Sequence, residues 1–121
     1  MSGRRDYWKV RLAAAAEADF DLILQWTAER FGKKQADVYA ETLLSALDAL
    51  KEGPAIVGAG TRNEIAKGLF TLHVARRGRK GRHFVLFRVG APAKPPVIDV
   101  LRLLHDAMDL PRHIESDERG R

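Results

Sequence analysis

Three apolar segments in the C-terminal half of the chain place tight limits on its fold. They run from Leu69 to Val74, from His83 to Val89 and from Val97 to His105. A basic loop joins the first two, and the Pro-rich segment from Gly90 to Pro96 joins the second pair. Apolar runs of this length, bounded by loops that contain glycine or proline, are typical of strands. We therefore expect three consecutive strands, paired antiparallel, with the rest of the chain packed against them.

The residues upstream predict a further strand and two helices. Tyr7–Leu12 alternates between two faces, which indicates a strand buried on one side. From Ala13 apolar side chains recur at helical spacing as far as Gly32, and a second helical pattern continues to Gly53-Pro54. The short connection makes the two helices an antiparallel hairpin. Residues 55–68 are irregular and contain glycine, so we expect a loop there.

The predicted order β-α-α-β-β-β defines an α+β fold in which an antiparallel sheet carries the helix hairpin on one face. A chain of 121 residues corresponds to a single domain, residues 1–121. We place its ordered core at about residues 7–114, because the remaining C-terminal residues are polar.

Composition narrows the class of protein. The chain contains no cysteine, which excludes disulfides and thiolate metal sites and suits the reducing cytoplasm. No apolar run approaches the ~18 residues that a membrane span needs, and the first residues lack the apolar core of a signal peptide. Histidines do not recur at the spacing of metal ligands, so we expect no metal site.

The excess positive charge is concentrated in one loop. Residues 76–82 hold five basic side chains and no acidic one, so the other 114 residues hold 16 basic and 16 acidic groups. The five are Arg76, Arg77, Arg79, Lys80 and Arg82. Such a loop is either a solvated hairpin tip or a contact for an acidic partner or a phosphate backbone. Direct nucleic-acid binding is not favoured, because no aromatic residues are interleaved with the charges and Trp26 is expected to pack within its helix.

Both faces of the predicted sheet are apolar. Within His83–Val89 and Val97–His105, side chains of both parities are apolar, as in strands that are covered on both sides. The helix hairpin can cover only one face. The other face is covered either by residues 55–68 and the C-terminal tail, or by a second subunit or a different protein.

Several motifs, in this order, resemble the RelE/ParE superfamily of toxins from bacterial toxin–antitoxin systems, and its ParE branch in particular. The first helix opens with Ala16-Glu17-Ala18-Asp19-Phe20, similar to the AEADL-like start of that branch. The strand that begins Arg82-His83 and ends Phe87-Arg88 is similar to its "GRH-apolar-YR" strand. The ending resembles its "LRVLH…MD…RH" pattern and is carried by Arg102, His105, Met108, Asp109, Arg112 and His113.

The resemblance implies a toxin that inhibits DNA gyrase and replication by binding, needs no cofactor, and is neutralised by a cognate antitoxin. The residues expected to contact the target are Arg88, Arg102, His105, Met108, Asp109, Arg112 and His113. The basic loop is an auxiliary cationic contact.

The RelE branch implies a different activity, a metal-independent, ribosome-dependent cleavage of mRNA. In that alternative Arg88 and Arg102 hold the phosphate and His105 serves as acid or base. Two observations argue against it. Phe87 stands where the family usually has a tyrosine, and positions 102 and 105 face opposite sides of a regular strand.

Overall fold

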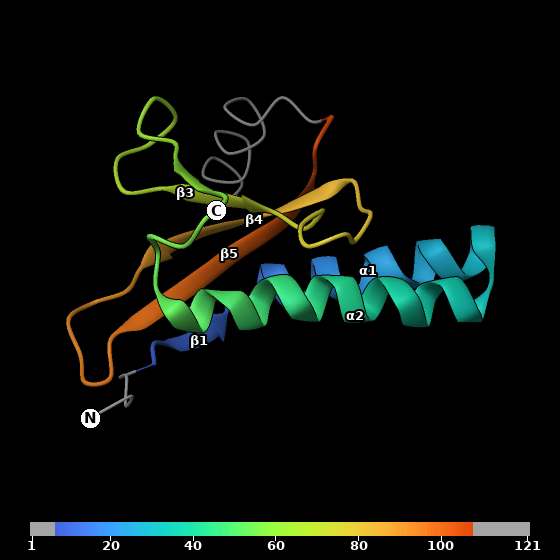
Figure 1. Ribbon diagram of the computed structural model, residues 1–121, viewed down its shortest axis with the longest axis horizontal. Helices are drawn as coiled ribbons and strands as arrows, with labels where there is room; N and C mark the ends of the chain where they lie inside the picture. Colours follow the sequence, from blue (N-terminus) through green and yellow to red (C-terminus); the bar gives the residue numbers. More distant parts are fainter. Residues whose placement is uncertain (1–6, 108–121) are drawn as a thin grey trace.

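The computed structural model describes residues 7–107 (Figure 1). Strand β1 (Lys9–Leu12) is followed by helix α1 (Ala14–Phe31), helix α2 (Lys33–Ala49) and the 3₁₀ helix η1 (Leu50–Glu52). Strands β2 (Ala59–Thr61), β3 (Phe70–His73), β4 (His83–Val89) and β5 (Val97–His105) complete the described chain. The α+β class is confirmed, and β4 and β5 have the predicted bounds. None of the described helices combines the length and the apolar character needed to cross a membrane.

The five strands form one mixed sheet in the order β1-β5-β4-β3-β2. Strands β3, β4 and β5 pair antiparallel in sequence order, as predicted, and β2 pairs antiparallel with β3. Strand β1 instead pairs parallel with β5, with Val10 beside Ile98. The prediction of a purely antiparallel sheet is therefore wrong for β1. The alternation in a short segment identifies a strand but does not fix the direction of a partner that is distant in the sequence.

The segment 55–68, predicted as a loop, contains the short strand β2. Ala59, Gly60 and Thr61 pair antiparallel with Leu72, Thr71 and Phe70 of β3. Three residues are too few to show a period of two, and glycine is depleted in strands, so the sequence pattern gave no sign of this edge strand.

The helix hairpin covers one face of the sheet, and Figure 1 shows α1 and α2 lying side by side along it. Gly32 separates the helices with a φ of 92°, a left-handed value that glycine adopts without strain. Leu43 and Leu47 of α2 are buried against Val85 and Phe87 of β4 in the main core. The hairpin therefore fixes the helices over the centre of the sheet.

A β-bulge changes which residues of β5 face the helices. Leu86 lies opposite Arg102 while Phe87 lies opposite Val100, so Leu101 is an extra residue. Regular alternation would place Leu104 with Ile98 and Val100. Leu103 joins the core under the helices instead, and Leu104 belongs to the cluster on the other face. A one-residue bulge reverses the facing of every residue beyond it, and the sequence alone did not reveal it.

The second face of the sheet is already covered in the single chain. Leu69, Leu86 and Leu104 form a cluster on it, and Leu86 and Leu104 are only 2% and 1% exposed. Ile65 and Ala66, from the loop before β3, pack against this cluster. Of the two alternatives for this face, cover by the chain's own residues is thus the one observed. The tail invoked in that alternative lies outside the described residues.

Candidate functional site

Arg102 of β5 is bound to a carboxylate of α1. Its Nε donates to Asp19 Oδ2 at 2.7 Å and its Nη2 donates to Asp19 Oδ1 at 3.0 Å. The Leu103 N–H also donates to Asp19 Oδ2, at 2.9 Å. This N–H lies beyond the residues of β5 that β1 pairs with, so the carboxylate satisfies an edge donor that would otherwise lack a strand partner. Arg102 therefore joins α1 to the sheet edge.

The structure does not bring Arg88 and His105 together. His105 lies opposite His83 at one end of β4, whereas Arg88 lies opposite Asp99 toward the other end. The five residue steps from His83 to Arg88 span about 17 Å at the rise of an antiparallel strand. Arg88 is exposed and has no hydrogen-bond or ion-pair partner within residues 7–107. The three residues of the nuclease alternative thus do not converge on one phosphate.

His105 belongs instead to a histidine cluster, formed with His73 and His83, at one end of the sheet. The three come from the adjacent strands β3, β4 and β5. The rings of His83 and His105 meet edge to face with their centroids 5.2 Å apart. His73 pairs with Phe84, the neighbour of His83, so His73 and His83 lie across one hairpin from each other.

Tyr39 of α2 forms a hydrogen bond with His83. The Arg82 N–H donates to the Tyr39 hydroxyl at 3.1 Å, and that hydroxyl lies 2.7 Å from His83 Nδ1. Because it accepts from Arg82, the Tyr39 hydroxyl is oriented with its own proton free to be donated to Nδ1 in the tautomer that leaves this nitrogen unprotonated. Burial, reinforced by the neighbouring His105, lowers the pKa of His83 to about 4. Burial also raises the pKa of Tyr39. Both groups are accordingly neutral at physiological pH.

Asp106, the residue after His105, accepts hydrogen bonds from His73 and Arg82. The Ala75 N–H donates to His73 Nδ1 at 3.0 Å, so His73 Nε2 carries the proton that it donates to Asp106 Oδ2 at 3.0 Å. Arg82 Nε donates to the same carboxylate at 3.2 Å. The hydrogen bond from His73, with that from Arg82, lowers the pKa of Asp106. Tyr39 and Asp106 were not among the predicted site residues, because nothing in their local sequence indicates that they meet three histidines.

The basic loop is held against the helices rather than projecting freely. The Arg79 N–H donates to the Arg76 carbonyl at 3.0 Å, and Arg77 and Gly78 between them have φ values of 53° and 81°. Positive φ at both central positions is the pattern of a type I′ turn. Arg79 Nη1 then reaches Thr42 Oγ1 of α2 at 3.5 Å. The loop therefore lies over the middle of the helix hairpin, as its yellow trace in Figure 1 shows.

Between this loop and the helices lies a groove of about 1210 Å³, which we call the basic groove. Trp26 and Phe31 line it and are 51% and 63% exposed. Trp26 packs against Phe31 and Arg30 of its own helix, as predicted, but the rest of its surface is open to the groove. The lining of the basic groove combines apolar side chains of both helices, the cations of the loop and two histidines. It consists of Leu22, Ile23, Trp26, Thr27, Phe31, Gln35, Val38, Tyr39, Thr42, Ala75, Gly78, Arg79, Lys80, Gly81, Arg82, His83 and His105.

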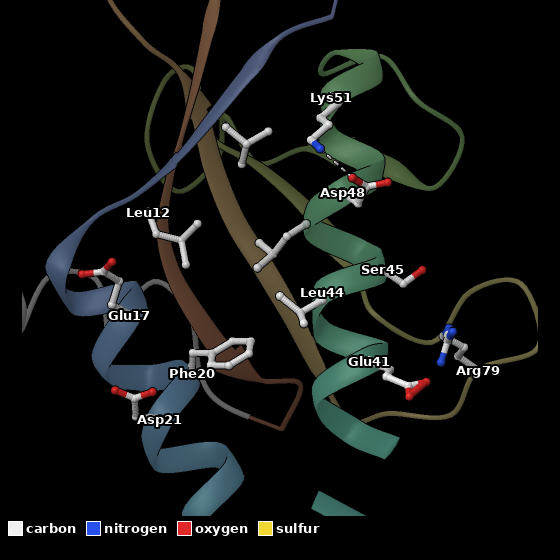
Figure 2. Close-up of a pocket in the computed structure, with 12 residues that line it drawn as sticks. Leu12, Glu17, Phe20, Asp21, Glu41, Leu44, Ser45, Asp48, Lys51 and Arg79 are labelled. Atoms are coloured by element: carbon white, nitrogen blue, oxygen red, sulfur yellow. Dashed lines mark ion pairs between the residues drawn. The ribbon is translucent and has the colours of Figure 1, made fainter. Parts of the chain in front are cut away.

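A second groove, of about 960 Å³, lies between the other ends of the two helices. Figure 2 shows Phe20 of α1 and Leu44 of α2 directed toward each other across it. Carboxylates line both sides, from Glu17 and Asp21 on α1 and from Glu41 and Asp48 on α2. Asp48 is paired with Lys51 at 2.9 Å. The helix hairpin thus presents an acidic groove and a basic groove.

Four predicted target contacts are not located by the structure. Met108, Asp109, Arg112 and His113 lie outside the described residues. Among the predicted residues within 7–107, His105 and Arg82 meet in the region of the histidine cluster, whereas Arg88 lies apart from it.

Comparisons with known proteins agree on one family. A family model described as the ParE toxin of the type II toxin–antitoxin system parDE matches residues 10–110. Toxin ParE1 of Caulobacter vibrioides is 31% identical over 104 residues, covering 86% of this chain and 95% of that protein. Toxin ParE1 of Mycobacterium tuberculosis H37Rv is 33% identical over 103 residues, covering 85% and 94%.

Solved structures share the fold. The chromosomal ParDE toxin–antitoxin system of P. aeruginosa contains a chain that matches with a TM-score of 0.65 and 23% identity, over 82% of this chain and 96% of that one. A YoeB/ParE toxin from Agrobacterium tumefaciens matches with a TM-score of 0.55 and 13% identity, over 80% and 96%. The extent of the family match and the identity to the ParE1 toxins go beyond fold. This chain belongs to the ParE toxin family of type II toxin–antitoxin systems.

Proposed function

We propose that this toxin acts by binding DNA gyrase, which blocks replication, and that a cognate antitoxin neutralises it in the cytoplasm. The observation that favours binding over catalysis is the position of the three residues that a nuclease would use, Arg88, Arg102 and His105. Arg102 is held by Asp19 in a pair whose side chains are 21% and 13% exposed. Because His105 of β5 lies opposite the first residue of β4 and Arg88 lies near the last, the three side chains offer no shared phosphate site.

Arg88 is the strongest candidate for a contact with the target among the described residues. Its guanidinium is exposed and unpaired within residues 7–107, so it can form a bidentate bond with a carboxylate without breaking an existing contact. Arg102 supports the surface instead, through its bond to α1. His105 is 43% exposed at the histidine cluster and remains a second candidate contact.

Exposed apolar side chains on the helix hairpin support a protein partner. Leu22, Val38 and Leu44 are each about half exposed or more. Apolar patches on paired helices are typical of surfaces that another polypeptide covers, and an antitoxin is the partner that the ParE family implies.

The test is a supercoiling assay with purified gyrase and relaxed plasmid. The toxin should inhibit supercoiling, and Arg88→Ala should weaken inhibition by about tenfold, a typical loss for one central charged contact. Lys67→Ala removes an exposed cation from the loop before β3 and serves as the matched control. Both variants should keep the thermal stability of the parent, since neither residue is buried.

Two results would contradict the proposed inhibition of gyrase. One is full gyrase activity at saturating toxin. The other is cleavage of ribosome-bound mRNA by the purified chain, which would establish the RelE-type activity instead. Growth arrest on expression of the toxin, relieved by co-expression of an antitoxin from a neighbouring reading frame, tests the neutralisation.

A further inference from the structure

The basic groove carries a charge pattern that the proposed gyrase contact does not use. Arg79, Lys80 and Arg82 line one side of it, and no carboxylate lines it among the described residues. The acidic groove on the same hairpin has four carboxylates in its lining. Arg79 and Lys51 also line the acidic groove, but there they lie among carboxylates. In the basic groove three cations face no carboxylate of the described residues, so their field favours a polyanion.

Two aromatic rings lie in the same groove. Trp26 and Phe31 meet at 67° with centroids 5.9 Å apart, so their free faces point in different directions. The Arg30 guanidinium lies 5.1 Å from the Trp26 ring centroid and covers one face of that ring. Trp26 and Phe31 nevertheless remain 51% and 63% exposed, and the fold supplies the aromatic residues that the basic loop lacks in the sequence.

We propose that the basic groove binds a single-stranded nucleic acid, with bases stacked on Trp26 and Phe31 and phosphates on Arg79, Lys80 and Arg82. Exposed aromatic faces beside a cationic groove are the features that bind single strands without sequence preference. A duplex does not expose its base faces, so it should bind less well.

The experiment measures the fluorescence anisotropy of labelled dT20 on titration with the full chain. The dissociation constant should rise about 16-fold between 50 and 200 mM salt, since three phosphate contacts give a slope of about −2. Trp26→Ala and Phe31→Ala should each weaken binding by about tenfold. Circular dichroism should show no loss of structure, because both rings are at least half exposed.

Matched variants separate the groove from the net charge of the chain. Lys80→Glu and Lys67→Glu change the net charge equally, but only Lys80 lines the groove. Lys80→Glu should weaken binding by about tenfold or more, and Lys67→Glu by less than about twofold. Leu44→Ala, in the acidic groove, should leave dT20 binding unchanged.

The proposal fails if dT20 does not bind at about 100 µM protein in low salt, the weak end of non-specific affinities. It also fails if Lys67→Glu weakens binding as much as Lys80→Glu, or if a duplex 20-mer binds as tightly as dT20. Displacement of dT20 by an equimolar acidic amphipathic peptide would assign the groove to a protein helix instead. None of these results depends on gyrase, so the supercoiling assay tests the proposed function separately.

Discussion

Asp19 and Arg102 form a two-bond ion pair that joins the first half of α1 to the edge of β5, with N···O distances of 2.7 and 3.0 Å. The same carboxylate accepts a hydrogen bond from the Leu103 N–H, just past the point where the pairing with β1 ends. One side chain therefore binds a charged group and satisfies a backbone donor. The pair therefore orients α1, which carries the aromatic side of the basic groove.

Asp19→Ala should lower the free energy of unfolding by about 3 kcal/mol, because it removes two charged hydrogen bonds from a largely buried arginine and the acceptor of a backbone donor. Urea unfolding measures this. Asp21→Ala, an exposed change further along the same helix, should shift stability by less than about 0.5 kcal/mol. In a double-mutant cycle with Arg102→Ala, additive losses would show that the two side chains are not coupled.

His83 should make stability depend on pH. Its folded pKa of about 4 lies below the ordinary value of 6.5, so between these values the unfolded chain binds a proton that the folded chain does not. Stability should therefore fall as pH drops from about 6.5 to about 4. His83→Asn keeps an acceptor for the Tyr39 hydroxyl but does not titrate. Urea unfolding at pH 7 and pH 5 should show a smaller difference for this variant, and an equal difference would contradict the role given to His83.

Gly81 sits where a side chain has no room. A Cβ there would lie 2.5 Å from Val74 Cγ2 and 3.0 Å from the Tyr39 ring and hydroxyl. Gly81→Ala should lower the free energy of unfolding by about 2 kcal/mol, the usual result of overpacking, and should disturb the Tyr39–His83 bond. Gly60→Ala is the control, because a Cβ at Gly60 meets nothing within 4 Å. Equal thermal midpoints for the two variants would show that the loop moves aside without loss.

Leu104→Ala tests whether the second face of the sheet is packed without a partner. Leu104 is 1% exposed, so its truncation in the isolated toxin should lower stability by about 3 kcal/mol. Leu44→Ala, at a position that is 53% exposed, should change stability by less than about 0.5 kcal/mol. If thermal melts of both variants match the parent, this face is loosely covered and needs another polypeptide.

The elements with strong local patterns could be predicted from the sequence. Strands β4 and β5 have the expected bounds, because long apolar runs ended by loops mark a strand without reference to its partners. The helix hairpin and the helix break at Gly32 follow from periodicity and from the conformational freedom of one glycine. The family likewise follows from motifs in a fixed order along the chain.

What depends on residues distant in the sequence was decided by the tertiary structure. The parallel pairing of β1 with β5, and the bulge that places Leu103 under the helices and Leu104 on the other face, arise from contacts between strands. The same holds for the site: Arg102 was expected to reach a ligand, but Asp19, 83 residues away in the sequence, holds it. Trp26 and the basic loop meet in one groove because α1 extends past the core, not because of any pattern near either. Local sequence sets which side chains are available and which backbone forms they favour. Packing decides which of them meet, because each contact depends on the position of every other element.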